Sequence, residues 1–262
     1  MARKYCNKTI HSHNKNQRKI QELETAIQNN YSAMSEPVQR KHWTEHDITH
    51  LHPLTQAQED FFRAYYESDW VVSYGSAGTG KTLLALYLSI LDVLDKQQPY
   101  NKIIIVRSVV PSREMGHLPG TIEEKQSVYE APYIDVMSFL CSRSSTYNDM
   151  KDAGLIKFES TSFIRGMTFD NSIVIIDEAQ NLNFQEINTV VTRLGKTSKL
   201  LVLGDIRQND LLYKKNDISG FASFIKISEE MKEASLVQFT VNDVVRSGLV
   251  KSWILTCDKL GY

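Results

Sequence analysis

The chain has 262 residues, of which 42% are hydrophobic and 23% charged, and its formal net charge at pH 7 is −1. These values are typical of a globular protein with a sizeable core. The near-zero net charge gives no global sign of a nucleic-acid partner, although opposite charges elsewhere in the chain would hide a local basic patch. No apolar run approaches the ~20 residues that span a bilayer, and the N-terminus lacks the apolar core of a signal peptide. Because the three cysteines lie far apart, which favours reduced thiols, we expect a cytoplasmic protein with no membrane contact.

Residues 1–50 are rich in Asn, Gln, Lys, Arg and His and poor in large aliphatic side chains. Such a segment buries little surface by itself, so we predict a polar, basic N-terminal extension that is partly disordered or helical. Its basic residues are possible contacts for a phosphate backbone, but a solvated tail is the favoured interpretation. Residues 51–262 are predicted to form a single domain.

A helix is predicted over residues 59–67, directly after the segment PLTQAQ at 53–58. The amide of a glutamine at this place can both donate to and accept from an adenine edge. Gln58 is the candidate for that contact and Gln56 is its rival, while a surface role is the simpler alternative for either.

The stretch 70–94 contains the strongest motif of the chain. A β-branched and aromatic strand at 70–74 ends at a glycine, and GSAGTGKT leads into an apolar helix, which matches the pattern G-x-x-x-x-G-K-[ST] of a phosphate-binding loop (P-loop). Its glycines let backbone N–H groups surround a polyphosphate at a helix N-terminus. We expect Lys81 to neutralise the β- and γ-phosphates and Thr82 to bind Mg²⁺. The predicted nucleotide-binding residues of the loop are Gly75, Ser76, Ala77, Gly78, Thr79, Gly80, Lys81 and Thr82.

The run KIIIVR at 102–107 is predicted to be a buried parallel strand. It leads into a loop at 108–120 that contains Arg113 and His117, and ligands bind beyond the carboxyl ends of such strands. The loop is therefore placed to meet the nucleotide or a second substrate. A helix with a break near Pro132 is expected from 121 to about 143, followed by short β-like pieces at 155–158 and 162–169.

A second informative stretch, SIVIIDEAQ at 172–180, is a buried strand that ends in two adjacent carboxylates. We expect Asp177 to hold Mg²⁺ indirectly, through its hydration shell or Thr82, and Glu178 to polarise the attacking water. After a helix at 184–194, the strand KLLVLG at 199–204 delivers Asp205 and Gln208 to the same edge of the sheet. Gln208 is the candidate that senses the γ-phosphate or the water. A helix at 219–231, a strand at 236–240 and a terminal helix at 243–257 complete the prediction.

Taken together, these segments resemble the PhoH family of P-loop ATPases, over about residues 52–258. The matching segments are LTQAQ at 54–58, GSAGTGKT at 75–82, HLPG at 117–120, FIRGMTF at 163–169, IVIIDEAQN at 173–181, TRLG at 192–195, GDIRQNDL at 204–211, SGF at 219–221 and DVVRS at 243–247. The segment RSVVPSREMGHLPG resembles the phage-encoded branch, for which the location would be the host cytoplasm. The family usually has Pro where this chain has Ser76, and Arg where it has Met167.

The resemblance implies a RecA-like α/β core with a mostly parallel sheet and helices on both faces, related to the nucleotide-binding half of superfamily 1 helicases. It also implies ATP and Mg²⁺ as cofactors, hydrolysis of ATP, ring-shaped homo-oligomers with a hexamer favoured, and an RNA or DNA substrate. A missing N-K-x-D motif disfavours a GTPase, and a small-molecule kinase would not ordinarily need Glu178.

Only 84 residues (262 minus 178) follow Glu178, whereas a domain typically takes ~100–150 residues. A second RecA-like half therefore has no room, so either a neighbouring copy completes the site or hydrolysis is slow. Arg246 is the first candidate for an arginine supplied in trans, ahead of Arg193 and Arg165.

The leading hypothesis is an oligomeric ATPase that moves on or remodels single-stranded RNA or DNA. Besides the basic N-terminal segment, the groups available to contact a nucleic-acid backbone are Arg107, Arg113, His117 and Lys125. The alternative is a nucleotide-dependent switch or stress-related binding module without translocation.

Overall fold

The computed structural model describes residues 43–108, 122–205 and 219–260, with side chains from residue 127 in the second range. They belong to one compact unit. The predicted boundary at residue 50 remains a prediction, since residues 1–42 lie outside the described ranges. In chain order the elements are η1 (Glu45–Asp47), α2 (Gln56–Glu67), β1 (Trp70–Gly75), α3 (Lys81–Leu94), β2 (Lys102–Arg107), α4 (Ile122–Cys141), α5 (Thr146–Asp152), β3 (Ile156–Ser160), β4 (Ser172–Ile176), η2 (Ala179–Asn181), α6 (Phe184–Val191), β5 (Lys199–Gly204), α7 (Phe221–Glu229), β6 (Ala234–Phe239), η4 (Val241–Asp243) and α8 (Gly248–Leu260).

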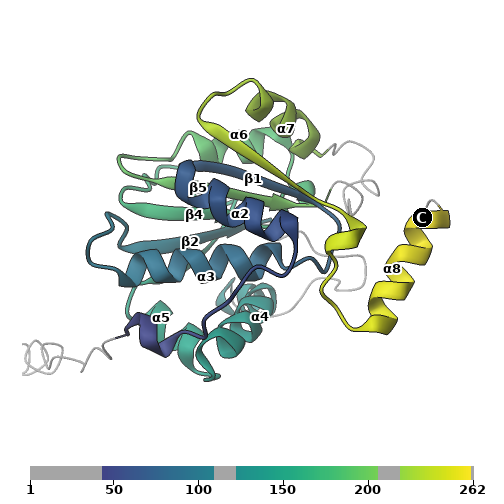
Figure 1. Ribbon diagram of the computed structural model, residues 1–262. Coiled ribbons are helices and arrows are strands. Elements are labelled where there is room, and N and C mark those ends of the chain that lie inside the picture. The colour runs from purple at the N-terminus through teal and green to yellow at the C-terminus, as the bar shows by residue number, and fades with distance from the viewer. Residues whose placement is uncertain (1–42, 109–121, 206–218, 261–262) are drawn as a thin grey trace, which may run out of the picture. The chain divides into compact units, whose positions relative to one another are not determined.

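The strands of the described residues form one six-stranded sheet in the order β3-β2-β4-β5-β1-β6 (Figure 1). Each pairing between neighbours in this sheet is parallel. The two central strands β4 and β5 are buried along their whole length, which explains why their sequences are continuous apolar runs. The order places β5 between the P-loop strand β1 and the strand β4 that leads to Asp177.

Helices cover both faces of the sheet, as predicted (Figure 1). Successive residues of a strand point to opposite faces, so the alternation divides the interior into two apolar clusters. Val71 and Ile103 face the cluster that includes Phe61 of α2, Leu86 of α3 and Met137 of α4. On the other face, the cluster contains Val72 and Ile104 with side chains of α6 and α7, namely Ile187, Val190, Phe221, Phe224 and Ile225. The α/β class is therefore confirmed.

Three local expectations were wrong. Helix α4 continues through Pro132 without ending, because the burial of Tyr133, Met137 and Leu140 beyond it offsets the backbone hydrogen bond that proline cannot make. Residues 162–169 form no strand and contribute one isolated bridge from Phe169. The terminal helix begins at Gly248 and not at 243, because Asp243 ends the short helix η4 and residues 244–247 are not helical.

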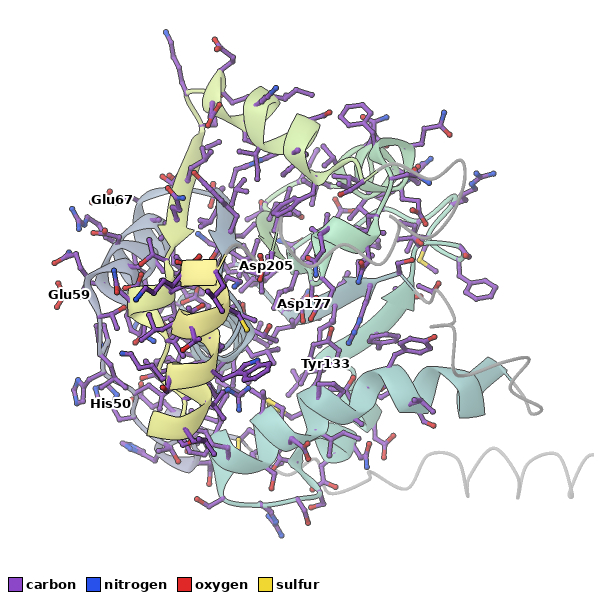
Figure 2. The ribbon with its side chains drawn as sticks, turned by 90° about the vertical axis from the view of Figure 1, so that its right-hand side faces the viewer. His50, Glu59, Glu67, Tyr133, Asp177 and Asp205 are labelled. Atoms are coloured by element: carbon purple, nitrogen blue, oxygen red, sulfur yellow. The ribbon has the colours of Figure 1, made fainter. Side chains whose placement is uncertain are left out.

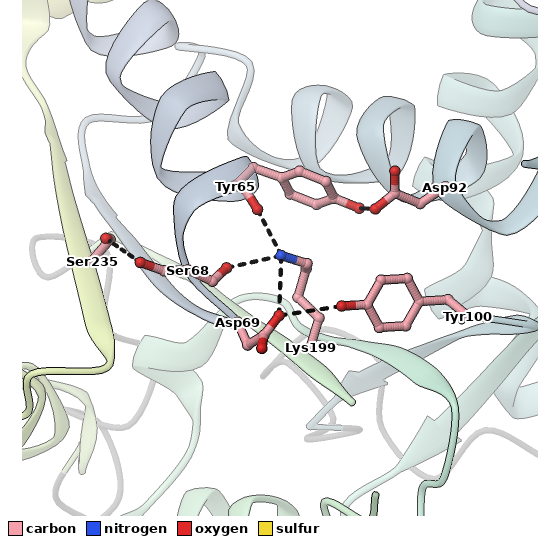
Figure 3. Close-up of polar contacts among 7 residues, drawn as sticks. All are labelled: Tyr65, Ser68, Asp69, Asp92, Tyr100, Lys199 and Ser235. Carbon is pink, nitrogen blue, oxygen red and sulfur yellow. Dashed lines mark hydrogen bonds and ion pairs between the residues drawn. The ribbon is translucent and has the colours of Figure 1, made fainter. Parts of the chain in front are cut away.

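A buried lysine fastens the carboxyl end of α2 to the start of β5 (Figure 3). The Lys199 ammonium donates to the backbone carbonyls of Tyr65 at 2.6 Å and Ser68 at 2.8 Å, and it lies 3.6 Å from the carboxylate of Asp69. Only 5% of Lys199 is exposed. Carbonyls at a helix end lack partners within the helix, so this side chain satisfies groups that burial would otherwise penalise.

Replacing Lys199 with methionine is expected to lower the free energy of unfolding by about 2–4 kcal/mol, because the carbonyls of Tyr65 and Ser68 lose their donor. Urea denaturation measures the change. Lys196→Met, at an exposed position three residues earlier, is the control and is expected to stay within about 0.5 kcal/mol of the unmodified chain. An unchanged midpoint for Lys199→Met would show that the network contributes no net stability.

Among the described residues, no helix is long and apolar enough to cross a membrane.

Candidate nucleotide-binding site

The P-loop connects β1 to α3 in a conformation that requires its glycines. Gly75 has a φ of +120°, and a Cβ there would lie 1.8 Å from the carbonyl oxygen of Phe239 in β6. Gly78 and Gly80 also have positive φ values, of +73° and +92°. The N–H of Ser76 donates to the same Phe239 carbonyl at 3.1 Å, a bond that proline could not make. The loop is therefore anchored to β6 at its first two residues.

Lys81 is the first residue of α3, and its side chain folds back over the loop. Its ammonium donates to the carbonyls of Gly75 and Ser76, each at 2.8 Å. Burial lowers the pKa of Lys81, while the carboxylates of Asp205, Asp177 and Glu178 act in the opposite direction. The ammonium thus lies between the P-loop and the carboxylates that follow β4 and β5.

The P-loop and the end of β4 meet at Thr82 and Asp177. The Thr82 hydroxyl donates to both carboxylate oxygens of Asp177, at 3.2 Å to Oδ1 and 3.3 Å to Oδ2. Burial, and then the neighbouring Glu178, raise the pKa of Asp177 to about 6. Because Mg²⁺ prefers oxygen ligands and a buried carboxylate favours a cation beside it, the two side chains fit the predicted magnesium site.

Tyr133 and Arg107 complete the surroundings of Asp177. The Tyr133 hydroxyl, from α4, donates to Asp177 Oδ2 at 3.0 Å. The positive charge of Arg107, at the end of β2, acts against the rise that burial causes in the pKa of Asp177. Figure 2 shows Tyr133, Asp177 and Asp205 at the same edge of the sheet. Arg107 was considered as a nucleic-acid contact, whereas no sequence pattern indicated Tyr133.

The residue after Asp177 has an unusual backbone. Glu178 has a φ of +52°, a left-handed conformation that costs a non-glycine residue of order 1–3 kcal/mol and is found at functional sites. Its carboxylate accepts from the Gln180 amide at 2.6 Å, and the amide oxygen of Gln180 accepts from the N–H of Asp205 at 2.9 Å. Gln180 therefore bridges the ends of β4 and β5. The sequence did not predict this role, and its one signal was a glutamine shortly after the two carboxylates Asp177 and Glu178.

With this geometry, the comparisons with known proteins identify the family. The family model described as "PhoH-like protein" matches residues 50–258. The chain belongs to the PhoH family. It is 34% identical to a PhoH-like protein of Bacillus subtilis over 206 residues, covering 78% of this chain and 63% of that protein. It is 32% identical to Protein PhoH of Escherichia coli over 205 residues, covering 78% and 57%.

The chain thus spans less than two thirds of the length of these two PhoH-family relatives. Among solved structures, it is similar to the Pif1 helicase from Candida albicans with a TM-score of 0.36 and 16% identity, covering 72% of this chain and 41% of that one. Family membership and the P-loop geometry together make the chain a P-loop protein of the PhoH family.

Gln58, the predicted adenine contact of this PhoH-family domain, is buried with 3% of its surface exposed. Its amide N–H donates to the carbonyl of Thr79 at 2.9 Å, and its amide oxygen accepts from the N–H of Leu54 at 2.8 Å. Gln58 therefore holds the P-loop at the Thr79 carbonyl. The side-chain amide of Gln58 has a second N–H that can donate to another partner. The rival Gln56 donates to Asp60 at 3.2 Å at the surface.

Arg246, in the family segment DVVRS, lies beside the P-loop of its own chain. A Cβ at Gly78 would lie 3.0 Å from Arg246 Cγ, and the N–H of Val245 donates to the Gly78 carbonyl at 3.2 Å. The other two candidate arginines differ in their surroundings. Arg165 is exposed, and Nε of Arg193 is buried with no hydrogen-bond partner among the residues that the structure describes. Three predicted site residues, Gln208, Arg113 and His117, lie outside the described residues, as does the side chain of Lys125.

Proposed function

We propose that this PhoH-family protein binds ATP with Mg²⁺ and hydrolyses it. The observation that carries the proposal is the contact between Thr82 and Asp177, which joins the P-loop to the strand β4 and places Lys81 and Glu178 at the same edge of the sheet. This is the arrangement of charges and hydroxyl groups that a triphosphate with a divalent cation requires.

Each side chain has a distinct role in the proposal. Lys81 exchanges its loop carbonyls for the β- and γ-phosphate oxygens. Thr82 would bind the magnesium ion and Asp177 would hold it indirectly, through its hydration shell or Thr82, and the ion would supply positive charge against the phosphates. Glu178, held by Gln180, accepts a proton from the attacking water. Gln208 is assigned to sensing the γ-phosphate, and the remaining N–H of Gln58 to the adenine.

Arg246 is assigned to the phosphate charge that develops during hydrolysis. Its position beside Gly78 of the same chain supports action within that chain. Action on a neighbouring copy is the alternative.

We further propose that the protein forms a homo-oligomer, with a six-membered ring favoured, and acts on single-stranded RNA or DNA. Helix α8 supports the oligomer, because none of its residues is buried and Leu249 and Trp253 are 84% and 71% exposed. Apolar surface of this kind marks sites of association. The exposed Arg165 and the basic residues of the N-terminal segment are available to a phosphate backbone. A nucleotide-dependent switch without translocation is the second candidate.

Single-stranded RNA or DNA is expected to raise the ATPase rate several-fold, since a motor protein hydrolyses ATP fastest when it is bound to the nucleic acid along which it moves. The rate is measured at low salt with several polynucleotides and with none, beside the mass in solution by light scattering. A mass of several chains with stimulation supports the motor. A rate that no polynucleotide changes would favour the switch and leave the ATPase assignment intact.

A further inference from the structure

Tyr133 is one of the most deeply buried side chains of the domain, with 1% of its surface exposed. A buried tyrosine hydroxyl usually finds a hydrogen-bond partner, and its own helix or the loop around it often supplies one. Here the hydroxyl crosses from α4 to the end of β4 and donates to Asp177 Oδ2 at 3.0 Å. The partner is the carboxylate assigned to magnesium.

The two oxygens of Asp177 are held from different directions. Oδ1 accepts from the backbone N–H of Glu178 at 3.0 Å, and Oδ2 accepts from Tyr133. The terminal torsion of an aspartate is broad and has no sharp preference of its own. These donors, together with the Thr82 hydroxyl, therefore set the plane of the carboxylate. Thr82 Oγ1 lies at nearly equal distances from both oxygens, 3.2 and 3.3 Å.

A second contact joins helix α4 to β2. The Arg107 guanidinium, at the end of β2, lies over the ring of Tyr129, 5.9 Å from its centroid, one helical turn before Tyr133. The same helix thus contacts β2 through Tyr129 and the carboxylate that follows β4 through Tyr133.

We propose that Tyr133 is a positioning residue for magnesium: by fixing the carboxylate plane of Asp177, it sets how tightly the P-loop binds ATP together with Mg²⁺. This inference rests on the proposed ATP and Mg²⁺ site. It assigns no contact between Tyr133 and the nucleotide, so binding of ATP without the metal is independent of the hydroxyl.

The test compares Tyr133→Phe with Tyr147→Phe. Tyr147 is also fully buried, and its hydroxyl donates to a buried carboxylate, Glu130 Oε2, at 2.8 Å, on the α4–α5 contact away from Asp177. The two substitutions remove the same chemical group from similar surroundings. Thermal unfolding establishes that both variants fold.

Equilibrium binding of a fluorescent ATP analogue is titrated with Mg²⁺ and, separately, in EDTA. In Tyr133→Phe the Mg²⁺ concentration for half-maximal enhancement of binding is expected to rise ~10-fold, the scale of one hydrogen bond to a charged group. Affinity in EDTA is expected to stay unchanged, and Tyr147→Phe is expected to match the unmodified chain in both conditions. If Tyr133→Phe does not fold, Tyr133→Met, whose flexible side chain fills the space and also lacks the hydroxyl, is expected to shift the Mg²⁺ requirement in the same direction.

Equal Mg²⁺ requirements in Tyr133→Phe and the unmodified chain would overturn the positioning role and leave the ATP site standing. Equal increases in both tyrosine variants would overturn it too, because they would reflect a general loosening of α4. If Mg²⁺ fails to enhance binding by the unmodified chain, the proposed function itself is wrong and the inference falls with it.

Discussion

Replacing Glu178 with glutamine is expected to slow ATP hydrolysis by at least ~10²-fold, the scale of a lost general base, while ATP still binds. Glutamine keeps the length of the side chain and an oxygen that can accept from Gln180, so the bridge to Asp205 is expected to persist. What disappears is the negative charge and the ability to accept a proton from water. Single-turnover release of phosphate measures the loss.

Glu229→Gln provides the matched control, because it makes the same chemical change at an exposed position of α7. Its rate is expected to equal that of the unmodified chain. Near-normal turnover in Glu178→Gln would place the base elsewhere and would leave the left-handed backbone of Glu178 without a catalytic explanation.

Replacing Lys81 with alanine is expected to weaken ATP binding by at least ~10²-fold, because the phosphates lose a partly buried charged donor. The ammonium already lies at the P-loop, 2.8 Å from two of its carbonyls. The substitution therefore removes a charged group that is at the phosphate site before ATP binds. Calorimetric titration with ATP and Mg²⁺ measures the affinity.

Lys226→Ala, on the exposed face of α7, tests whether removal of any positive charge has the same effect. It is expected to bind ATP as the unmodified chain does. Unimpaired affinity in Lys81→Ala would contradict the assignment of the P-loop as the phosphate site.

The parts of the site that the sequence predicted are those that depend on local geometry. The P-loop is a run of eight residues in which positive φ values require glycine and the helix begins at Lys81. The sequence motif therefore predicts the backbone conformation of the loop almost directly. The meeting of Thr82 and Asp177 was also predictable, because both follow parallel strands and the carboxyl ends of such strands share one edge.

Contacts between distant segments that do not both follow parallel strands, or that depend on side-chain packing, were beyond prediction. Tyr133 lies 44 residues before Asp177 on a helix whose orientation is fixed by packing, and no spacing rule connects a tyrosine on one element to a carboxylate on another. Similarly, Gln180 bonds Asp205, 25 residues away. The continuation of α4 through Pro132 shows the same effect, since tertiary packing outweighed a strong local signal against helix.

Arg246 illustrates a subtler limit. Its identity as a candidate came from its place after the last strand, but its partner depends on the path of the chain after β6. The backbone bond from Val245 to Gly78 brings that path back to the P-loop.

A calorimetric titration of the unmodified chain with ATP and Mg²⁺, followed by an assay for released phosphate, tests the central claim most directly. The same measurements are the reference for both variants. We predict saturable binding followed by phosphate release that EDTA abolishes. Absence of binding, or phosphate release at the same rate in Lys81→Ala, would contradict the assignment of this site as an ATPase centre.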